Sequence, residues 1–468
     1  MSSGMNLSTC ARDLEWIGCI DFGTTFSKFA MVVAADREEL NRCDVQPLPI
    51  SVGPDYRDLN EYLLPSVVFV TEDALLFSKE ASDAAKRANG SVRSAFLSPK
   101  QYLSTFDLAQ YDAPLPKEID PTGQFTARNL LRLFMAHLLE RAGAHAKAKD
   151  LPWPVPLRIA RPAWAKERAK AGEKLLQDLV IKGFALVDRL GPALSKSGGL
   201  RHADALAAIK EAEKAAGEPD GTMFLLARNG SASVLEATAV ATNSRRKRGR
   251  RLVVVADIGG GTSDFGTFMT PIRGQKTIAE IKDSSQILKE AGDYLDMQLR
   301  RELLSRAGYL QDDPAARGVS LRLLAQARIN KETLFNTSSL SLDVGEEFVT
   351  INLDEFLNTP HVKAFTERLR LRFHHALLYA HKCAEANKSK DGLIPPIEIM
   401  LTGGGHALPM VADLLKDPGL PGIYTPAAPE FLESEEKLDF DESRRQLAVA
   451  IGGAMRDLPS VRSIQAER

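Results

Sequence analysis

The stretch IGCIDFGTT at residues 17–25 has a counterpart far along the chain, VVVADIGGGT at residues 253–262. In each copy an apolar run ends in an aspartate, Asp21 or Asp257, and a turn rich in glycine and threonine follows it. A second apolar run comes after each turn, which is the pattern of a β-hairpin. Two similar hairpins this far apart predict two related lobes that face one another.

The two turns have the composition of a phosphate-binding site. A tight glycine turn exposes successive backbone N–H groups and leaves no side chain in the way of a phosphate. Aspartate supplies a hard oxygen ligand for Mg²⁺, which keeps several waters and bridges phosphate oxygens. One copy alone is equally typical of an ordinary turn with a capping aspartate, whereas two copies favour a grip on one triphosphate. The candidate groups are Gly23, Thr24, Thr25, Gly259, Gly260, Gly261 and Thr262, with Asp21 and Asp257 acting on Mg²⁺ through water.

A third glycine run, TGGG at residues 402–405, follows an apolar segment and precedes a predicted helix from Met410. Glycines at a strand-to-helix turn let a nucleotide approach the backbone, so Gly403, Gly404 and Gly405 are candidate nucleotide contacts. The run lacks the lysine of a P-loop and the spaced glycines of a dinucleotide fold, so neither of those classes is supported. Taken alone, it is more typical of a glycine-rich connector.

Strands and helices are mixed along the rest of the chain. Apolar periodicity predicts helices at residues 126–145, 164–180, 204–216, 294–307, 321–334 and 363–386, and strands near 65–70, 157–160, 348–353 and 398–401. This mixed order, with apolar strands bounded by glycine and proline, predicts an α/β fold.

The three glycine segments, in this order, resemble the two phosphate motifs and the adenosine motif of the actin, sugar-kinase and heat-shock chaperone superfamily. Their wording is most similar to the nucleotide-binding domain of the seventy-kilodalton heat-shock (DnaK-type) chaperones, over about residues 16–458. The resemblance implies an actin-like ATPase fold, with two similar ribonuclease-H-like lobes, an α/β subdomain on each, and a nucleotide cleft between them. ATP or ADP and Mg²⁺ are the implied cofactors.

The resemblance also implies a division of the chain. The expected boundaries are 14–250 for lobe I, about 45–145 for its subdomain IB, about 190–222 for an inserted helical element, 251–440 for lobe II, about 286–370 for its subdomain IIB, and 441–468 for a C-terminal helix that returns to lobe I. The inserted element is expected to be a solvated helical hairpin. No peptide-binding domain is expected, because the sequence stops shortly after the second connecting helix.

Roles for three further residues come from the resemblance. Lys100 follows a segment similar to the family's P-S-x-V-x-F strand and would stabilise developing charge or orient the attacking water. Glu236 opens a segment similar to the first connecting helix and would order metal-bound water, while Lys331 matches one lysine of the purine-binding motif. The candidate catalytic residues are Lys100, Glu236, Asp257, Asp21 and Thr262.

Three departures from the family stand beside these matches. Ala237 replaces the proline that is tied to the family's conformational switch, and Ala407 replaces the arginine that packs on the adenine. In the purine-binding motif around residues 328–332, only the lysine matches. Coupling between nucleotide state and lobe angle, and the adenosine contacts, are therefore the least supported parts of the resemblance.

Composition excludes several classes of partner. Sixty basic and 61 acidic residues leave a net charge of -1, so no field of one sign attracts nucleic acid or an anionic membrane. The basic run at residues 244–251 is compatible with a nucleic-acid contact or an address signal, but a solvated loop is the favoured interpretation. No stretch approaches the ~18 apolar residues of a membrane span. Four cysteines without zinc-ligand spacing fit a reduced, cytoplasmic setting.

The expected function is that of an Mg²⁺-dependent ATPase switch, which hydrolyses ATP to ADP and phosphate and thereby regulates an unidentified partner protein. Three alternatives stay open. One is a filament-forming, self-associating ATPase. Another is a small-molecule kinase, which needs a carboxylate base for the acceptor hydroxyl. The last is a nucleotide-binding scaffold with little turnover.

Overall fold

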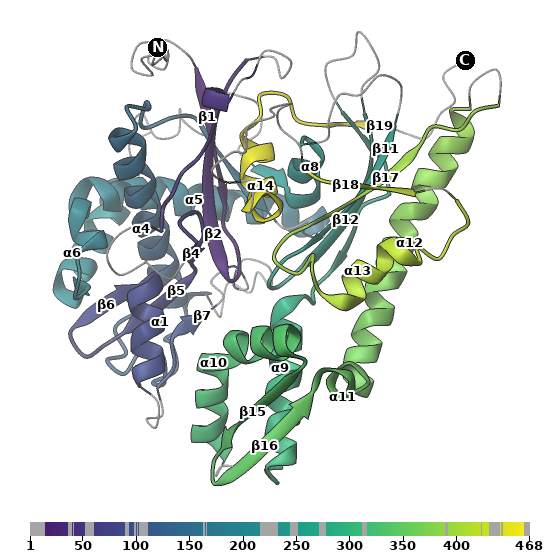
Figure 1. The fold of residues 1–468 in the computed structure, drawn as a ribbon. Coiled ribbons are helices and arrows are strands. Elements are labelled where there is room, and N and C mark those ends of the chain that lie inside the picture. The colour runs from purple at the N-terminus through teal and green to yellow at the C-terminus, as the bar shows by residue number, and fades with distance from the viewer. Residues whose placement is uncertain are drawn as a thin grey trace, which may run out of the picture.

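The computed structural model describes residues 15–35, 40, 42–51, 60–88, 93–97, 100, 102, 111–161, 164, 166–215, 233–243, 251–270, 278–310, 316–388, 392–422, 424–429, 440 and 443–462. Helices and strands are mixed along this part of the chain, and the predicted α/β class is confirmed. Two halves lie side by side, each built on its own sheet, and two helices lie between the sheets (Figure 1).

A six-stranded sheet forms the centre of the N-terminal half. The first copy of the repeat is its central hairpin, in which β1 (Trp16–Asp21) pairs antiparallel with β2 (Phe26–Val33). Every residue of β1 is buried, as expected for a strand covered on both faces. The remaining strands are β8 (Leu157–Arg161), parallel to β1; β10 (Ser233–Leu235), parallel to β8; and β3 (Val45–Pro47) and β4 (Leu64–Pro65), both antiparallel to β2.

A seven-stranded sheet in the C-terminal half repeats this arrangement. The second hairpin is β11 (Leu252–Ile258) with β12 (Ser263–Met269). Its neighbours are β17 (Ile397–Thr402), parallel to β11; β18 (Tyr424–Ala427), parallel to β17; and β13 (Ala279–Ile281) and β14 (Gln286–Leu288), both antiparallel to β12. The order β18-β17-β11-β12-β13 matches β10-β8-β1-β2-β3 in order and direction. The internal repeat therefore extends from a hairpin to five strands.

Two short helices join the sheets. α8 (Glu236–Ala241) is buried along its whole length and packs on β11 and β12, while α14 (Arg444–Ala454) packs on β1 and β2. The two helices also pack on each other. One apolar cluster runs from the first sheet through both helices to the inner face of β11, so the two halves share a core.

Each half carries further elements beyond its central sheet. In the N-terminal half they are η1 (Arg42–Asp44), β5 (Val67–Val70), β6 (Ala74–Phe77), α1 (Ser78–Arg87), β7 (Phe96–Leu97), α4 (Ala127–Ala148), α5 (Lys166–Leu190), η3 (Gly191–Ser195), β9 (Leu200–Arg201) and α6 (His202–Ala215). In the C-terminal half they are α9 (Gly292–Arg306), α10 (Ala316–Thr337), β15 (Ser339–Val344), β16 (Glu347–Asn352), α11 (Leu353–Leu357), α12 (Pro360–Ala386) and α13 (Pro409–Lys416). All six predicted helices overlap helices of the structure.

The inserted element differs from its prediction. Where a solvated helical hairpin was expected, the described residues 190–215 contain the short helix η3, the strand β9 and the helix α6. β9 pairs with β6, and Ala205, Ala208 and Ala212 of α6 are buried. Lys182 of α5 donates to the Ala212 carbonyl at 2.8 Å. The expectation of a solvated decoration is therefore wrong, because small alanine side chains let α6 pack closely on α5.

The C-terminal segment contacts both sheets, whereas only a return to the first was predicted. α14 packs on the first sheet, as expected, but β19 (Ser460–Arg462) then pairs in parallel with β13 of the second sheet. Residues 216–222 of the inserted element and residues 244–250 of the basic run lie outside the described residues. Arg251, the last residue of that run, forms an ion pair with Glu398 at 2.6 Å.

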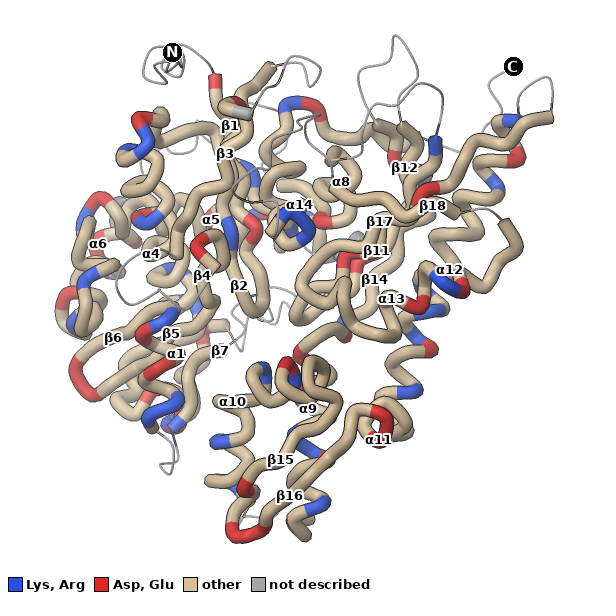
Figure 2. The backbone as a smooth tube through the Cα atoms, viewed as in Figure 1, with Lys and Arg blue, Asp and Glu red and all other residues tan. Residues whose placement is uncertain are grey.

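Basic and acidic residues are interspersed over both halves of the described part of the protein (Figure 2). Among the described helices, none combines the length and the apolar character that crossing a membrane requires.

The crossing of α8 and α14 provides a test of the shared core. A Cβ at Gly452 would lie 1.9 Å from the Ala239 carbonyl oxygen, so Gly452→Ala is expected to lower the free energy of unfolding by about 1–3 kcal/mol. Gly318→Ala on α10 is the control, because its Cβ would meet nothing within 4 Å and alanine favours the helix by up to about 1 kcal/mol. Urea unfolding of both variants measures the difference. An unchanged midpoint for Gly452→Ala would contradict the close crossing.

Candidate nucleotide site

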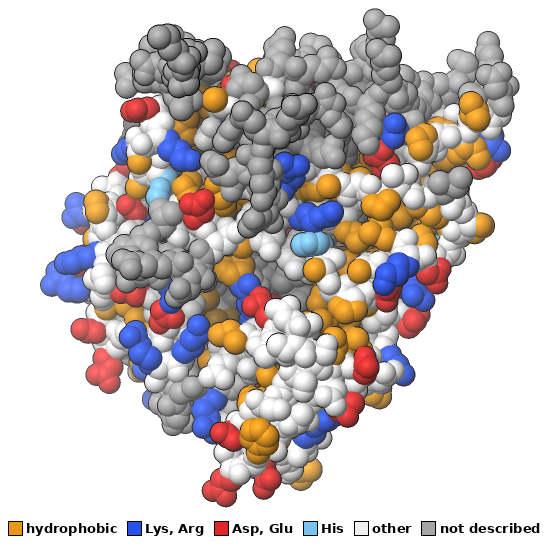
Figure 3. Space-filling model, viewed as in Figure 1, with side chains coloured by type: hydrophobic (Ala, Val, Ile, Leu, Met, Phe, Trp, Pro, Cys, Tyr) orange, Lys and Arg blue, Asp and Glu red, His pale blue; other side chains and the backbone are white. Residues whose placement is uncertain are grey.

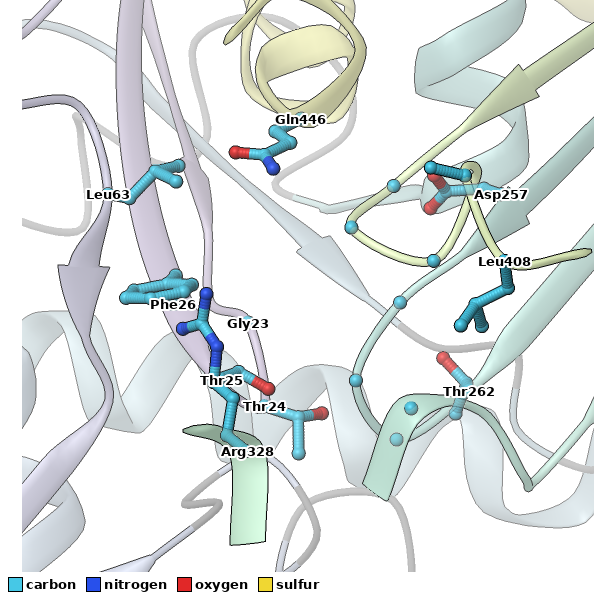
Figure 4. A pocket seen from close by; sticks show the side chains of 18 of the residues that line it. Gly23, Thr24, Thr25, Phe26, Leu63, Asp257, Thr262, Arg328, Leu408 and Gln446 are labelled. Carbon is cyan, nitrogen blue, oxygen red and sulfur yellow. The ribbon is translucent and has the colours of Figure 1, made fainter. Parts of the chain in front are cut away.

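Every candidate residue selected from the sequence lines one cavity of about 320 Å³. Figure 4 shows some of the lining residues from close by. This volume lies at the lower end of the range for small-molecule sites. The predicted residues that line it are Asp21, Gly23, Thr24, Thr25, Lys100, Glu236, Asp257, Gly259, Gly260, Gly261, Thr262, Lys331, Gly403, Gly404 and Gly405. Three glycine segments that are far apart in the sequence thus meet at one place.

The two hairpin turns contact each other directly. A Cβ at Gly260 would lie 2.4 Å from Thr25 Oγ1, and one at Gly261 would lie 2.8 Å from Thr24 Oγ1. Such distances are shorter than real Cβ contacts, so a side chain at either glycine would push the turns apart. Figure 4 shows Thr24 and Thr25 beside the loop that leads to Thr262.

The backbone N–H groups of the predicted turn residues differ in their hydrogen bonding. The N–H of Gly23 donates to the Asp21 carbonyl at 3.0 Å, and that of Gly259 donates to the Thr262 carbonyl at 2.9 Å. These two groups shape the turns and are therefore not free to hold a phosphate. The backbone N–H groups of Thr24, Gly260 and Gly261 donate to no acceptor within the described residues.

The third glycine run is fastened to the end of β11. Gly403 has a φ of +78°, and a Cβ there would lie 2.2 Å from the Ile258 carbonyl oxygen. The N–H of Gly405 donates to the same oxygen at 2.8 Å. Gly403 therefore needs to be glycine both for its backbone conformation and for its close approach to β11.

Four buried carboxylates gather beneath the turns. Asp21, Glu236, Asp257 and Asp264 are each 4% exposed. Burial, followed by the charges of Glu236 and Asp21, raises the pKa of Asp257 to about 7, although Thr402 Oγ1 donates to its Oδ1 at 2.8 Å. Burial and the charge of Glu236 likewise raise the pKa of Asp264 well above its usual value.

Two lysines balance part of this negative charge. Lys28 Nζ lies 2.7 Å from Asp21 Oδ2, and Lys100 forms a buried ion pair with Glu236. Burial disfavours the charge of Lys100, but the carboxylates of Glu236 and Asp21 outweigh this effect and raise its pKa. Among the described residues, Asp21 and Glu236 thus have a lysine partner, while Asp257 and Asp264, which form no ion pair there, are the two carboxyl groups whose pKa is raised.

The residues fit a Mg²⁺ ion that is shared with phosphate. Within the described ranges, no three His, Cys, Asp or Glu side chains form a group that could hold a metal by themselves. Mg²⁺ commonly uses only one or two carboxylates together with waters and substrate phosphates. Asp264 Oδ2 is buried without a hydrogen-bond partner among the described residues, beside the raised-pKa carboxylate of Asp257. An unpaired oxygen in an acidic cluster is what a bound cation would satisfy.

Side chains of α10 line one wall of the cavity. The Arg328 guanidinium lies 4.1 Å from the centre of the Phe26 ring, and its Nε donates to Glu332 Oε1 at 2.7 Å. Figure 4 shows Arg328 reaching from α10 to Phe26 on the other half. Ala407, which replaces the arginine of the family's motif, also lines the cavity. Guanidinium stacking on Phe26 is thus a contact between the halves.

Lys331 lies at the wall of the cavity, but it is occupied. Its Nζ is 2.9 Å from Asp296 Oδ1 and 3.0 Å from the Gly292 carbonyl oxygen. The N–H of Gly292 in turn donates to the Gly259 carbonyl at 3.3 Å. Lys331 therefore braces α9 against the second turn, a role that the motif match did not predict.

Lys28 and Asp264 are the main site residues that the sequence interpretation missed. Each is the direct cross-strand partner of a predicted aspartate: Lys28 of Asp21, and Asp264 of Asp257. Alignment of the two repeats places Lys28 and Asp264 at the same position, seven residues after the aspartate. A tight hairpin with that spacing could have identified both, because cross-strand partners lie about 5 Å apart.

Comparison with known proteins adds no functional assignment. No protein-family model matches the chain, and no curated protein matches it. Function is therefore inferred from the geometry and chemistry of the cavity.

The raised pKa of Asp257 predicts a pH-dependent effect of Asp257→Asn in EDTA without nucleotide. The folded-state pKa is about 7 instead of 3.8, so the unfolded chain releases this proton first and stability falls between about pH 4 and pH 7. Asparagine avoids that loss. The Tm of the variant should therefore exceed that of the wild type by a few degrees or so at pH 8, and by less at pH 5.

Thermal melts of both proteins at the two pH values measure this effect. Asp413→Asn, which removes a half-exposed aspartate on α13, is the control and should show no pH-dependent gain. A wild type more stable than Asp257→Asn at pH 8 would contradict the electrostatic account of the cluster.

Proposed function

We propose that this protein is an ATP-binding, Mg²⁺-dependent ATPase switch with an actin-like fold of two ribonuclease-H-like lobes, similar to the nucleotide-binding domain of DnaK-type chaperones. The observation that carries the proposal is the convergence of two equivalent glycine turns and a third glycine run on one cavity. The matching order of five strands in the two sheets supports the actin-like fold. The acidic cluster beneath the turns supports Mg²⁺ as the cofactor.

In the proposed mechanism, the N–H groups of Thr24, Gly260 and Gly261, which have no acceptor within the described residues, hold phosphate oxygens in the cavity that both turns line. Mg²⁺, when bound, supplies charge neutralisation at the phosphates. Lys100 stabilises the charge that develops on the transferred phosphoryl group, and Glu236 orients water. Hydrolysis in such a site depends mostly on positioning and on charge.

The proposed output is a change in the separation of the two halves that regulates a partner protein. Contacts across the cavity, such as Arg328 on Phe26, would form or break as the halves close or open. Hydrophobic side chains gather on the surface over α12, α13 and β18 (Figure 3), a place where a partner or a second copy of the chain could bind.

A nucleotide-binding scaffold with little turnover is the second candidate. Lys100 and Glu236, the two groups assigned to catalysis, form a buried ion pair with each other. As long as they stay paired, neither can act on water or on a phosphate. Binding without hydrolysis would favour this candidate.

The central test measures ATP binding by calorimetry and phosphate release with Mg²⁺ for the wild type and Asp257→Asn. The wild type should bind ATP, and Asp257→Asn should weaken Mg²⁺-ATP binding by about tenfold or more, because one carboxylate beside the cation is lost. Both proteins must remain folded in thermal melts. A wild type that binds no nucleotide in Mg²⁺ would refute the proposal.

Lys100→Ala separates binding from hydrolysis. ATP affinity should change little, while the hydrolysis rate should fall on the order of a hundredfold, since a charge that acts in the transition state is removed. The single variant leaves Glu236 buried without its partner. Lys100→Ala combined with Glu236→Gln is therefore the matched control for folding. Normal hydrolysis by Lys100→Ala would remove this lysine from the mechanism.

A further inference from the structure

The two repeated hairpins carry opposite charges at equivalent positions. Asp21 ends the first strand of one hairpin and has Lys28 as its cross-strand partner. Asp257 holds the same place in the other hairpin, but its partner is Asp264. The first hairpin thus neutralises its own aspartate, whereas the second places two carboxylates side by side.

Lys28 lies at the first glycine turn. Its Nζ is 2.7 Å from Asp21 Oδ2, and it would lie 3.5 Å from a Cβ on Gly23, so the ammonium sits over the first glycine turn. The side chain is 16% exposed and lines the cavity. Its positive charge also reaches Asp257 in the second hairpin. A long, flexible lysine in this place can contact Asp21 or a bound phosphate.

We propose that Lys28 is an exchangeable counter-ion, which binds Asp21 when the cavity holds no nucleotide and moves to the phosphates when a triphosphate enters. While Lys28 holds Asp21, a divalent cation does not bind the acidic cluster tightly by itself. The move frees Asp21 to accept a hydrogen bond from metal-bound water. Nucleotide and metal consequently enter together. This inference rests on the proposed function, which it deepens by assigning the order of binding.

Because of the charges at the site, the proposal predicts opposite effects of removing Lys28 on the affinity for a metal ion and on the affinity for nucleotide. Among the described residues, two of the four carboxyl groups have a lysine partner, namely Asp21 with Lys28 and Glu236 with Lys100. Removal of Lys28 makes the cluster more negative, so a cation alone should bind more tightly. The same removal takes a positive charge away from the phosphates, so nucleotide should bind more weakly. A lysine that served only to stabilise the fold would not strengthen metal binding.

Lys28→Met tests this directly, because methionine keeps an unbranched side chain without the charge. Calorimetry with MnCl₂ alone should show weak binding to the wild type and binding at least roughly tenfold tighter to Lys28→Met. The affinity for ATP in Mg²⁺ should fall by about tenfold. Lys28→Arg keeps the charge and should resemble the wild type in both measurements.

Lys182→Met is the matched control, since Lys182 is a lysine away from the cavity that is buried and donates to the Ala212 carbonyl on α6. It should change neither affinity. Thermal melts check folding, and Lys28→Gln replaces Lys28→Met if the methionine variant does not fold.

The inference is overturned if nucleotide binds but removal of Lys28 does not tighten Mn²⁺ binding. It is also overturned if the wild type binds Mn²⁺ alone as tightly as the variant does. A wild type that binds no nucleotide refutes the proposed function, and the exchange with it, whatever Mn²⁺ does. The nucleotide measurement on the wild type therefore distinguishes the two failures.

Discussion

Contact between two glycine turns fixes the place where the halves of this protein meet. Gly260 and Gly261 approach Thr25 and Thr24 so closely that no side chain fits between them. Each turn is held by its own hairpin, and each hairpin is the centre of a five-strand arrangement that occurs twice. Because the aspartates end the strands just before these turns, convergence of the turns also brings the carboxylates together. The contact between the turns therefore forms the cavity and also gathers the carboxylates beneath it.

Bringing these carboxylates together has an electrostatic cost. Asp21 and Glu236 each have a lysine partner, whereas Asp257 and Asp264 lie opposite each other in one strand pair and have no such partner in the described part of the chain. Burial and like charge raise the pKa values of both aspartates. Such unfavourable arrangements are concentrated at functional sites, where a ligand relieves them. In this protein a cation would relieve the repulsion, and its binding would then stabilise the folded state.

The sequence predicted those parts of the site that depend on local pattern. A strand that ends in Asp21 or Asp257 and is followed by glycines is a short-range feature, and each predicted lining residue reached the cavity. Features that depend on tertiary packing were either not predicted or predicted wrongly. Packing of α6 on α5 requires the fold around it, and the pairing of β19 with β13 joins segments far apart in the chain. Lys28 was not predicted, although the spacing of a tight hairpin places it opposite Asp21.

The turns and the side chains of the cavity differ in predictability. The turns follow from glycine in two repeated hairpins, which is a local sequence pattern. The contact of Arg328 with Phe26 does not follow from a local pattern, because it joins residues of the two halves while Glu332 holds the guanidinium. Phe26 directly follows Thr25, so this contact lies beside the first turn (Figure 4). A change in the separation of the halves would therefore alter the side-chain contact and the contact between the turns together.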